Sequence, residues 1–289
     1  MMEIKFLGTG SAFTTKNWNA NTLITKNGKN LLIDIGGDMK HELADAGMVY
    51  RDIDAIYISH LHGDHSDGGE LFGFCTYFDP AFKDKKIQLY GNGDLLRKLW
   101  DNCWKGKMES VQGAVCELSS YFDVNMVRPN GKFIWEDVEF TLVQTIHIVN
   151  GFVFVPSFGL LVKDNESGKT VFFTTDTQNS PSQLKDFYKM ADLIIQDCEV
   201  NAFKSGVHAH FDELNATVSP EIKSRMILDH YHDDILEPDE LLRKIMTILP
   251  EGAPVPYTKL YKVSDVWKQK AATAGFKGFA EKGQVIVVA

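Results

Sequence analysis

The sequence predicts an α+β fold in which two mixed β-sheets pack face to face and helices cover their outer surfaces, giving a four-layer αββα sandwich. Two observations favour this fold. Strand patterns followed by helical patterns occur twice along the chain, and hairpins rather than regular βαβ units connect most of the strands. No Pro/Ser-rich linker interrupts the 289 residues, so we predict one domain over residues 1–289.

The first part of the chain contains short apolar runs separated by turn residues. Residues 3–7 alternate polar and apolar side chains, which predicts a strand, and Asn27-Gly28 is typical of a two-residue hairpin turn. Residues 92–120 are predicted to be mostly helical, as an insertion that serves as a lid or a dimer element. The patterns together predict strands over residues 3–7, 21–26, 30–35 and 55–59 and helices over 39–48 and 66–78.

The second part of the chain alternates strand patterns with helical segments. Asn130-Gly131 and Glu136-Asp137 are turn signals that divide residues 122–145 into three short strands. Strand patterns therefore occur in both halves of the chain, which is consistent with one sheet from each half. The remaining patterns predict strands over residues 153–163, 169–174, 193–195, 226–229 and 285–288 and helices over 181–189, 212–223 and 265–274.

The composition narrows the classes of function. The chain has 30 Lys and Arg against 39 Asp and Glu, a net charge of −9, whereas proteins that grip a long nucleic-acid backbone usually present a basic surface. This balance favours a small substrate. The four cysteines form no C-x-x-C pair, and the sequence shows neither a signal-peptide pattern nor an apolar run of the roughly 18 residues that span a bilayer. We therefore expect a cytoplasmic protein that does not act in a membrane.

Four side chains of metal-ligand type follow the predicted strand 55–59. His60, His62, Asp64 and His65 stand within six residues, and imidazole nitrogens and carboxylate oxygens are donors that Zn²⁺ and related ions use. A short loop after a buried strand aims these side chains at one point, and alternation lets His60 and His62 serve one metal and Asp64 another. The segment therefore predicts a metal site rather than a solvated polar loop.

Three more residues of ligand type each come directly after a predicted strand: His147, Asp176 and His230. Taken singly, they have ordinary alternatives, namely a surface histidine, a helix N-cap and a structural histidine beside a carboxylate. His232 is the alternative to His230. Because strand ends on one side of a sandwich converge, the three residues together with the histidine-rich loop predict a site for two metals.

These motifs resemble those of the metallo-β-lactamase-fold hydrolases, whose signature is H-x-H-x-D-H. Within that superfamily, the chain is most similar to the ribonuclease Z and cyclic-nucleotide phosphodiesterase branch. The resemblance runs from Lys5 to about His230 and implies the four-layer sandwich described above. The similar segments are residues 6–12 (FLGTGSA), residues 157–161 (SFGLL), Glu199 after its strand and residues 206–214 (GVHAHFDEL).

The resemblance also implies the cofactors and their ligands. They would be two divalent metal ions, with Zn²⁺ favoured and Mn, Fe or Ni ions as alternatives. Asp176 would bridge the two ions. The first ion would be bound by His60, His62 and His147, and the second by Asp64, His65 and His230.

Catalytic roles follow from the same resemblance. A water activated by the two ions would attack phosphorus, and Asp64 counts among the catalytic residues as well as among the ligands. His208, held by Glu199, would protonate the leaving group. His210 is the alternative to His208 as the proton donor.

The favoured function is therefore metal-dependent hydrolysis of a small phosphodiester such as a cyclic nucleotide. A ribonuclease Z-like RNA-processing nuclease is one alternative, although it would need a local basic face. A lactonase or thioesterase on the same site is a second, and a non-catalytic binding protein is a third. We expect a homodimer whose partner is a small nucleotide or other phosphodiester, with RNA less favoured.

Overall fold

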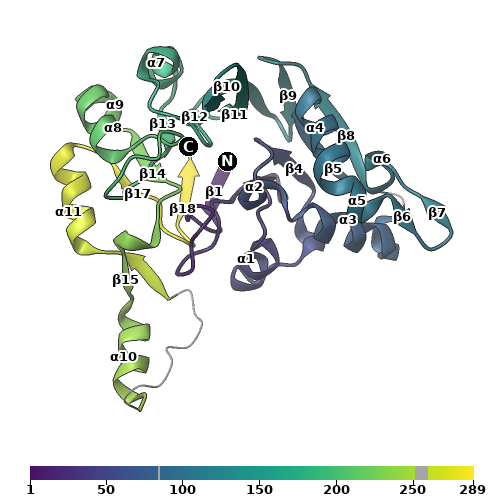
Figure 1. Ribbon diagram of the computed structural model, residues 1–289, viewed down its shortest axis with the longest axis horizontal. Coiled ribbons are helices and arrows are strands. Elements are labelled where there is room, and N and C mark those ends of the chain that lie inside the picture. The colour runs from purple at the N-terminus through teal and green to yellow at the C-terminus, as the bar shows by residue number, and fades with distance from the viewer. Residues whose placement is uncertain (84, 251–259) are drawn as a thin grey trace.

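The computed structural model describes residues 1–83, 85–250 and 260–289, and these residues form two seven-stranded sheets that pack face to face (Figure 1). Across the first sheet, the strands are β18 (Val285–Val288), β1 (Met2–Phe6), β2 (Thr22–Lys26), β3 (Lys29–Ile33), β4 (Ala55–Ile58), β5 (Ile87–Asn92) and β8 (Phe122–Val127). Across the second sheet, they are β17 (Gly278–Phe279), β14 (Met226–Asp229), β13 (Leu193–Asp197), β12 (Thr170–Phe173), β11 (Val153–Asp164), β10 (Val138–Asn150) and β9 (Lys132–Trp135).

Both sheets have the same mixed design. In the first, β18, β1, β2 and β3 pair antiparallel, whereas β3, β4, β5 and β8 pair parallel. In the second, β9 to β12 pair antiparallel, whereas β12, β13, β14 and β17 pair parallel. Loops after β4, β12 and β14 contain six of the seven predicted metal ligands, and the antiparallel strand β10 contains His147.

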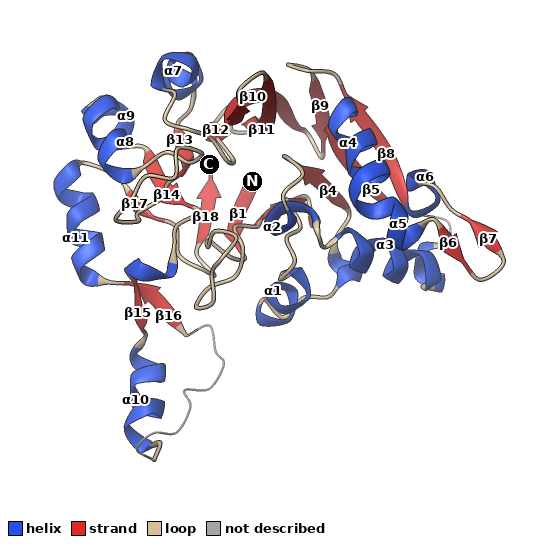
Figure 2. Ribbon diagram, in the orientation of Figure 1, coloured by secondary structure: helices blue, strands red, loops and turns tan. Residues whose placement is uncertain are grey.

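Helices cover the outer faces of the two sheets (Figure 2). Beside the first sheet are α1 (Met39–Asp45), α3 (Gly69–Phe78), α4 (Gly93–Leu99), the π-helical turn η3 (Trp100–Trp104), α5 (Lys105–Met108), α6 (Leu118–Tyr121) and the 3₁₀ turns η1 (Tyr50–Asp52) and η2 (Pro80–Phe82). Beside the second sheet are α7 (Pro181–Met190), α8 (Phe211–Thr217), α9 (Pro220–Lys223) and α11 (Asp265–Ala274). The predicted four-layer αββα sandwich is confirmed.

A few short elements lie outside these layers. The small turn α2 (Gly63–Ser66) lies in the loop after β4, and β6 (Ser110–Val111) pairs with β7 (Ala114–Val115). The turn η4 (Asp233–Ile235) leads to β15 (Leu236–Pro238), which pairs with β16 (Tyr261–Val263), and α10 (Glu240–Ile248) projects from this end of the molecule (Figure 1). In the described parts of the chain, every helix is too short or too polar to cross a membrane.

Apolar side chains fill the three spaces between the four layers. On β4, Ala55 and Tyr57 face the second sheet, whereas Ile56 and Ile58 face the helices, as the two-residue period of a strand requires. All four side chains are fully buried. A continuous apolar run is typical of a parallel strand that is covered on both faces, and it fixes the position of the loop that begins at residue 59.

Most predicted strands are confirmed, whereas strand β5 was not predicted and one predicted helix is wrong in its extent. The segment 92–120 contains helices, yet β5 was missed and its last residue, Asn92, caps α4 by accepting hydrogen bonds from the next turn. The predicted helix 212–223 breaks into α8 and α9, because Pro220 cannot continue the first helix. Leu96 and Trp104 pack under the first sheet, while the insertion and its role as a lid or dimer element stay predictions.

Candidate metal centre

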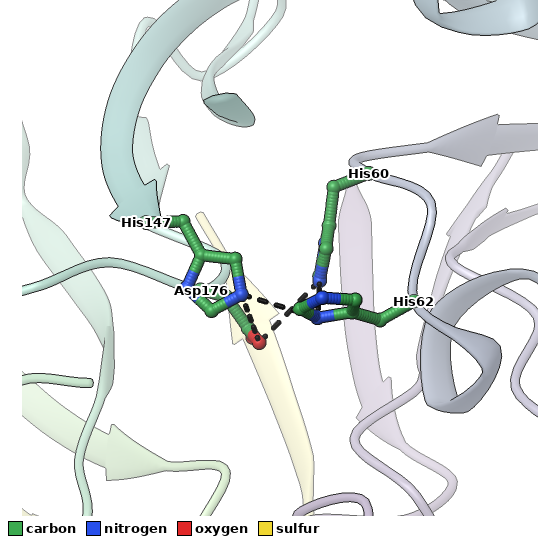
Figure 3. Close-up of side chains that lie close together, drawn as sticks. All are labelled: His60, His62, His147 and Asp176. Carbon is green, nitrogen blue, oxygen red and sulfur yellow. Dashed lines mark hydrogen bonds and ion pairs between the residues drawn. The ribbon is translucent and has the colours of Figure 1, made fainter. Parts of the chain in front are cut away.

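The fold brings the seven predicted metal ligands together from four different elements. Their donor atoms form two groups, and within each group the atoms lie within 4.8 Å of one another. The first group is His60, His62, His147 and Asp176 (Figure 3), and the second is Asp64, His65, Asp176 and His230. Asp176 alone belongs to both of these groups.

The first group has the spacing of a coordination shell. His62 Nδ1 lies 3.1 Å from His60 Nε2 and 3.1 Å from His147 Nε2. Asp176 Oδ2 lies 3.5 Å from His60 Nε2 and 3.6 Å from His147 Nε2. Ligands about 2.0–2.1 Å from a tetrahedral metal are about 3.3–3.4 Å apart. The four donor atoms therefore fit one metal ion.

The second group has the same spacing. Asp64 Oδ2 lies 3.2 Å from His65 Nε2 and 3.3 Å from His230 Nε2. Asp176 Oδ1 lies 3.3 Å from His65 Nε2 and 3.6 Å from His230 Nε2. His65 Nε2 is buried, and among the described residues it contacts both carboxylates without forming a well-aligned hydrogen bond, which fits a metal-ligand atom. Because Asp176 offers Oδ1 here and Oδ2 to the first group, its carboxylate stands between the two.

A β-bulge directs His147 into the site. Ile146 pairs with Pro156 and Ile148 pairs with Val155, so His147 is the extra residue on β10. The prediction that the strand ends at residue 145 is wrong, because β10 continues to Asn150 in a long hairpin with β11. Regular alternation along β10 would point His147 to the same side as Val143, away from the first sheet. The bulge turns the His147 side chain into the site instead.

Two ligand loops contain residues in the left-handed backbone region. Thr175, directly before Asp176, has φ 50°, and His230 itself has φ 61°. This region is uncommon for any residue other than glycine and is a clear outlier for a β-branched threonine. Strained backbone of this kind concentrates at functional sites. Here it turns both ligands towards the same point, while the alternative His232 lies outside both groups.

Gly36 lets the loop after β3 pack against the histidine-rich loop. A side chain at Gly36 would overlap the carbonyl oxygen of Asp64. The backbone N–H of Ile35 also donates to the carbonyl oxygen of His65 at 2.9 Å. Glycine is therefore required at this close approach, which holds Asp64 and His65 in place.

Hydrogen bonds on the far side of two rings set which nitrogen faces the site. His65 Nδ1 donates to Asp34 Oδ2 at 2.8 Å, and His147 Nδ1 donates to the carbonyl oxygen of Val207 at 3.0 Å. In both rings, the nitrogen left to face a metal is therefore Nε2. Such outer partners orient ligand rings and increase their basicity.

Asp34 supports a second histidine through Ser59. The Ser59 hydroxyl donates to Asp34 Oδ2 at 2.6 Å and lies 3.0 Å from His60 Nδ1. The Ser59 backbone N–H donates to Asp34 Oδ1 at 2.7 Å. Asp34 is buried and has φ 64°. It therefore orients one ligand in each group, a role that the sequence analysis missed.

We expect Asp34→Asn to weaken metal binding by roughly 10- to 100-fold, because it removes the charged partner of His65. Asparagine keeps the size of the side chain and tolerates a positive φ, so the backbone should hold. The measurement is competition for the metal against a chelator of known affinity. Asp54→Asn, a change in a more exposed carboxylate outside the site, should leave the affinity unchanged. Equal affinities for Asp34→Asn and the unmodified protein would rule out this supporting role.

Burial and carboxylates set the charges of the ligands. Burial holds the pKa of His60 and His147 below the usual range, so both are neutral and able to bind a metal. Burial also opposes a charge on His65, but Asp176 and Asp64 outweigh it and hold the pKa of His65 well above the usual range. These carboxylates hold a proton on His65 when no metal is present, and a bound cation would replace that proton.

His208 lies beside the ligands and pairs with Asp197, not with Glu199 as predicted. His208 Nδ1 lies 2.9 Å from Asp197 Oδ2. The His208 ring centroid is 5.2 Å from that of His147 and 4.8 Å from that of His230. Burial opposes a charge on His208, but Asp197 outweighs it and raises the pKa of His208. The histidine and carboxylate pair therefore exists, with a different acid.

Glu199 and His210 stabilise the local loop instead. Glu199 Oε1 accepts a hydrogen bond from the backbone N–H of Ser205 at 2.8 Å. His210 Nδ1 accepts from the backbone N–H of Asp212 at 3.2 Å, which caps α8, and His210 Nε2 donates to the carbonyl oxygen of Asn201 at 2.9 Å. Both ring nitrogens of His210 are engaged, so the geometry favours His208 over His210 as a proton donor.

The sequence and the fold match known proteins. A family model described as Anti-Pycsar protein Apyc1 matches residues 2–254. A relative from Bacillus phage BSP38, also named Anti-Pycsar protein Apyc1, is 32% identical over 240 residues, which cover 81% of this chain and 90% of the relative.

Solved structures share the fold at low sequence identity. The metallo-beta-lactamase fold protein YhfI from Bacillus subtilis matches with a TM-score of 0.65 and 19% identity, over 99% of this chain and 98% of YhfI. The short form of human tRNase Z matches with a TM-score of 0.59 and 21% identity, over 80% of this chain and 93% of that protein. The predicted metallo-β-lactamase fold is confirmed. The chain belongs to the Anti-Pycsar protein Apyc1 family.

Proposed function

We propose that the chain is a dinuclear metal-dependent phosphodiesterase that hydrolyses a small phosphodiester, with a cyclic nucleotide as the favoured substrate. The position of Asp176 carries this proposal. Its two carboxylate oxygens lie 3.5 Å from His60 Nε2 and 3.3 Å from His65 Nε2, one in each ligand group. A pair of divalent ions is the arrangement that phosphatases and nucleases use for in-line displacement at phosphorus.

The ligand set favours Zn²⁺, with Mn, Fe or Ni ions as alternatives, because imidazole nitrogens and carboxylate oxygens suit all of them. When bound, the ion pair would supply an acidified water and positive charge for the oxygens on phosphorus. The chain's own contribution is to hold the seven ligands rigid. Buried strand ends, the bulge at His147 and the carboxylate of Asp34 perform that task.

His208 is the proposed proton donor to the leaving oxygen. Opening a cyclic phosphodiester releases an alkoxide, which is a poor leaving group unless it receives a proton. His208 Nδ1 is held by Asp197, so Nε2 is the nitrogen that would transfer the proton. The side chain of His208 is 17% exposed, whereas that of His147 is fully buried. His208 is therefore accessible to a substrate at the ligands.

The variant His208→Ala should affect substrates according to their leaving group. For a 3′,5′-cyclic nucleotide, kcat/KM should fall by roughly 10²- to 10⁴-fold, the usual contribution of general acid catalysis. For bis(p-nitrophenyl) phosphate, the fall should be much smaller, because p-nitrophenolate leaves without a proton. The two kcat/KM values are measured on protein loaded with the same metal, and metal content is checked in each sample.

The exposed histidine of α1, His41, provides the control, since His41→Ala should leave both rates unchanged. An equal loss on both substrates, or a loss of bound metal, would make His208 a ligand or a structural residue. No loss on either substrate would remove it from the mechanism.

The substrate class is tested with a panel of compounds. The panel contains 3′,5′-cyclic nucleotides, linear dinucleotides, a tRNA precursor, a lactone and a thioester. We expect the cyclic diesters to have the highest kcat/KM. Faster turnover of the tRNA precursor, or of the lactone or thioester, would favour the corresponding alternative activity. The homodimer and the cytoplasmic location stay predictions.

A further inference from the structure

The tip of the β10–β11 hairpin exposes apolar side chains near the metal centre. Phe152 at the turn is fully exposed, and Val149 and Phe154 are each 48% exposed. The same hairpin carries His147, so this exposed apolar tip is connected directly to a metal ligand.

The strand register places Phe154 on the side of the hairpin that faces the first sheet. Even-numbered residues of β11 point that way, because Leu160 and Val162 lie in the core between the sheets and the Phe158 side chain packs in the apolar cluster of the first sheet. Phe154 follows the same alternation. The histidine-rich loop that begins after Ser59 therefore stands on the same side as the Phe154 ring.

The same register places Phe154 a short distance from the ligands. Phe154 pairs directly with Val149, two residues beyond His147 on β10. Strand geometry puts Val149 about 7 Å along the chain from His147 and Phe154 about 5 Å to its side. A nucleotide whose phosphate lies at the metal ligands carries its base away from them across one sugar ring. The base would therefore reach the wall formed by this hairpin.

We propose that Phe154 stacks on the nucleobase of the substrate and so acts as a specificity-determining residue for nucleotides over diesters without a base. This inference rests on the proposed phosphodiesterase function. A phenyl ring presents only an apolar face, and every base has a complementary face, so stacking is tolerant of base identity. We expect purine and pyrimidine cyclic nucleotides to depend on Phe154 to a similar degree.

The test compares Phe154→Ala with the unmodified protein on two kinds of substrate. For 3′,5′-cyclic nucleotides, KM should rise roughly 5- to 100-fold, the range expected for loss of one stacking contact, while kcat changes little. For 1-O-methylribose 3′,5′-cyclic phosphate, which has no base, KM and kcat should stay the same. Phe154→Trp should restore the low KM, whereas Phe154→Leu, which keeps apolar bulk without a ring, should not.

Phe78→Ala serves as the matched control, because Phe78 is 65% exposed at the end of α3, away from the hairpin. It should leave both substrates unaffected. Equal KM values for Phe154→Ala and the unmodified protein on cyclic nucleotides would overturn the stacking role. A lower molecular mass of Phe154→Ala in light scattering would also overturn it, since the hairpin would then be a subunit contact. If the unmodified protein hydrolyses neither substrate, the phosphodiesterase function itself fails.

Discussion

Replacing Asp176 with alanine is expected to lower kcat/KM for a phosphodiester by about a thousandfold or more, which corresponds to ~4 kcal/mol of transition-state stabilisation. Asp176 is the residue whose oxygens reach both ligand groups, with Oδ2 towards His60 and Oδ1 towards His65. Its loss removes a ligand from each group. We therefore expect fewer than two metals per chain as well as slower turnover, both measured on the same preparation.

Asp176→Asn separates the charge of this side chain from its size. The amide fills the same space, yet it replaces one carboxylate oxygen with a nitrogen that carries protons. We expect a loss close to that of Asp176→Ala. Asp192→Ala, a change at a half-exposed residue that pairs with Lys169 on the surface, should keep full activity and metal content. An Asp176→Ala protein that keeps two metals and more than a tenth of its activity would contradict the bridging role.

The second large effect concerns stability rather than catalysis. Lys26 Nζ bonds to Asp164 at 2.6 Å, and both side chains are almost completely buried at the join between the two sheets. Lys26→Met would leave Asp164 as an unpaired buried charge. We expect the free energy of unfolding to fall by about 3–5 kcal/mol, as for other broken buried pairs, measured by urea denaturation of the metal-loaded protein.

Two comparisons test this explanation. The double variant Lys26→Met with Asp164→Asn should be more stable than Lys26→Met alone, because the unpaired charge is gone. Lys29→Met breaks an ion pair whose lysine is 42% exposed, and it should cost less than about 1 kcal/mol. A loss for Lys26→Met no larger than that for Lys29→Met would refute the buried-pair explanation.

The Lys26–Asp164 pair also makes the difference in stability between the unmodified protein and Lys26→Met depend on pH. Burial opposes the charge of Asp164, but the hydrogen bond from Lys26 outweighs it and lowers the pKa of Asp164. A lowered pKa in the folded state gives stability that is present above the unfolded pKa of about 3.9. That stability is lost as the pH falls through the lower folded value. The gap between the unmodified protein and Lys26→Met should therefore shrink as the pH falls, because buried Asp164 is protonated more readily once Lys26 is gone, and the stability that the pair gives the unmodified protein is itself lost below about pH 4.

The positions of most candidate metal ligands could be predicted because they depend on local sequence. The ligand-type residues from His60 to His65 are recognisable by their close spacing within one loop. Asp176 and His230 each come after a strand of the second sheet. Parallel β12, β13 and β14 bring those strand ends to one edge. The direction of His147 needed the pairing of β10 with β11, which no local pattern specifies.

The partner of His208 could not be chosen from alternation alone. Asp197 and Glu199 are two residues apart, so a strand would point both to the same side. β13 ends at Asp197, however, and Glu199 already bonds to the loop around His210. The pairing of β13 with β14 indicates the correct acid. Asp197 pairs with Asp229, the residue directly before His230, so Asp197 lies beside the metal site.

Asp34 was missed for a different reason. It lies in a Gly-rich loop, far along the chain from the histidines that it supports, and its role depends on the left-handed backbone that turns it towards Ser59 and His65. Neither the conformation nor the contact has a pattern in the sequence. Supporting residues of this kind depend on tertiary structure, whereas six of the seven predicted ligands follow the ends of strands.

The proposal of a two-metal phosphodiesterase is tested most directly by turnover of a 3′,5′-cyclic nucleotide as metal is returned to metal-depleted protein. The product is identified by chromatography, and the bound metal is counted at each step. We expect no product without metal, and formation of the linear nucleoside monophosphate at a rate that rises until two ions are bound per chain. Full activity with one ion, activity that persists in chelator, or no monophosphate with any of Zn, Mn, Fe or Ni would contradict the proposal.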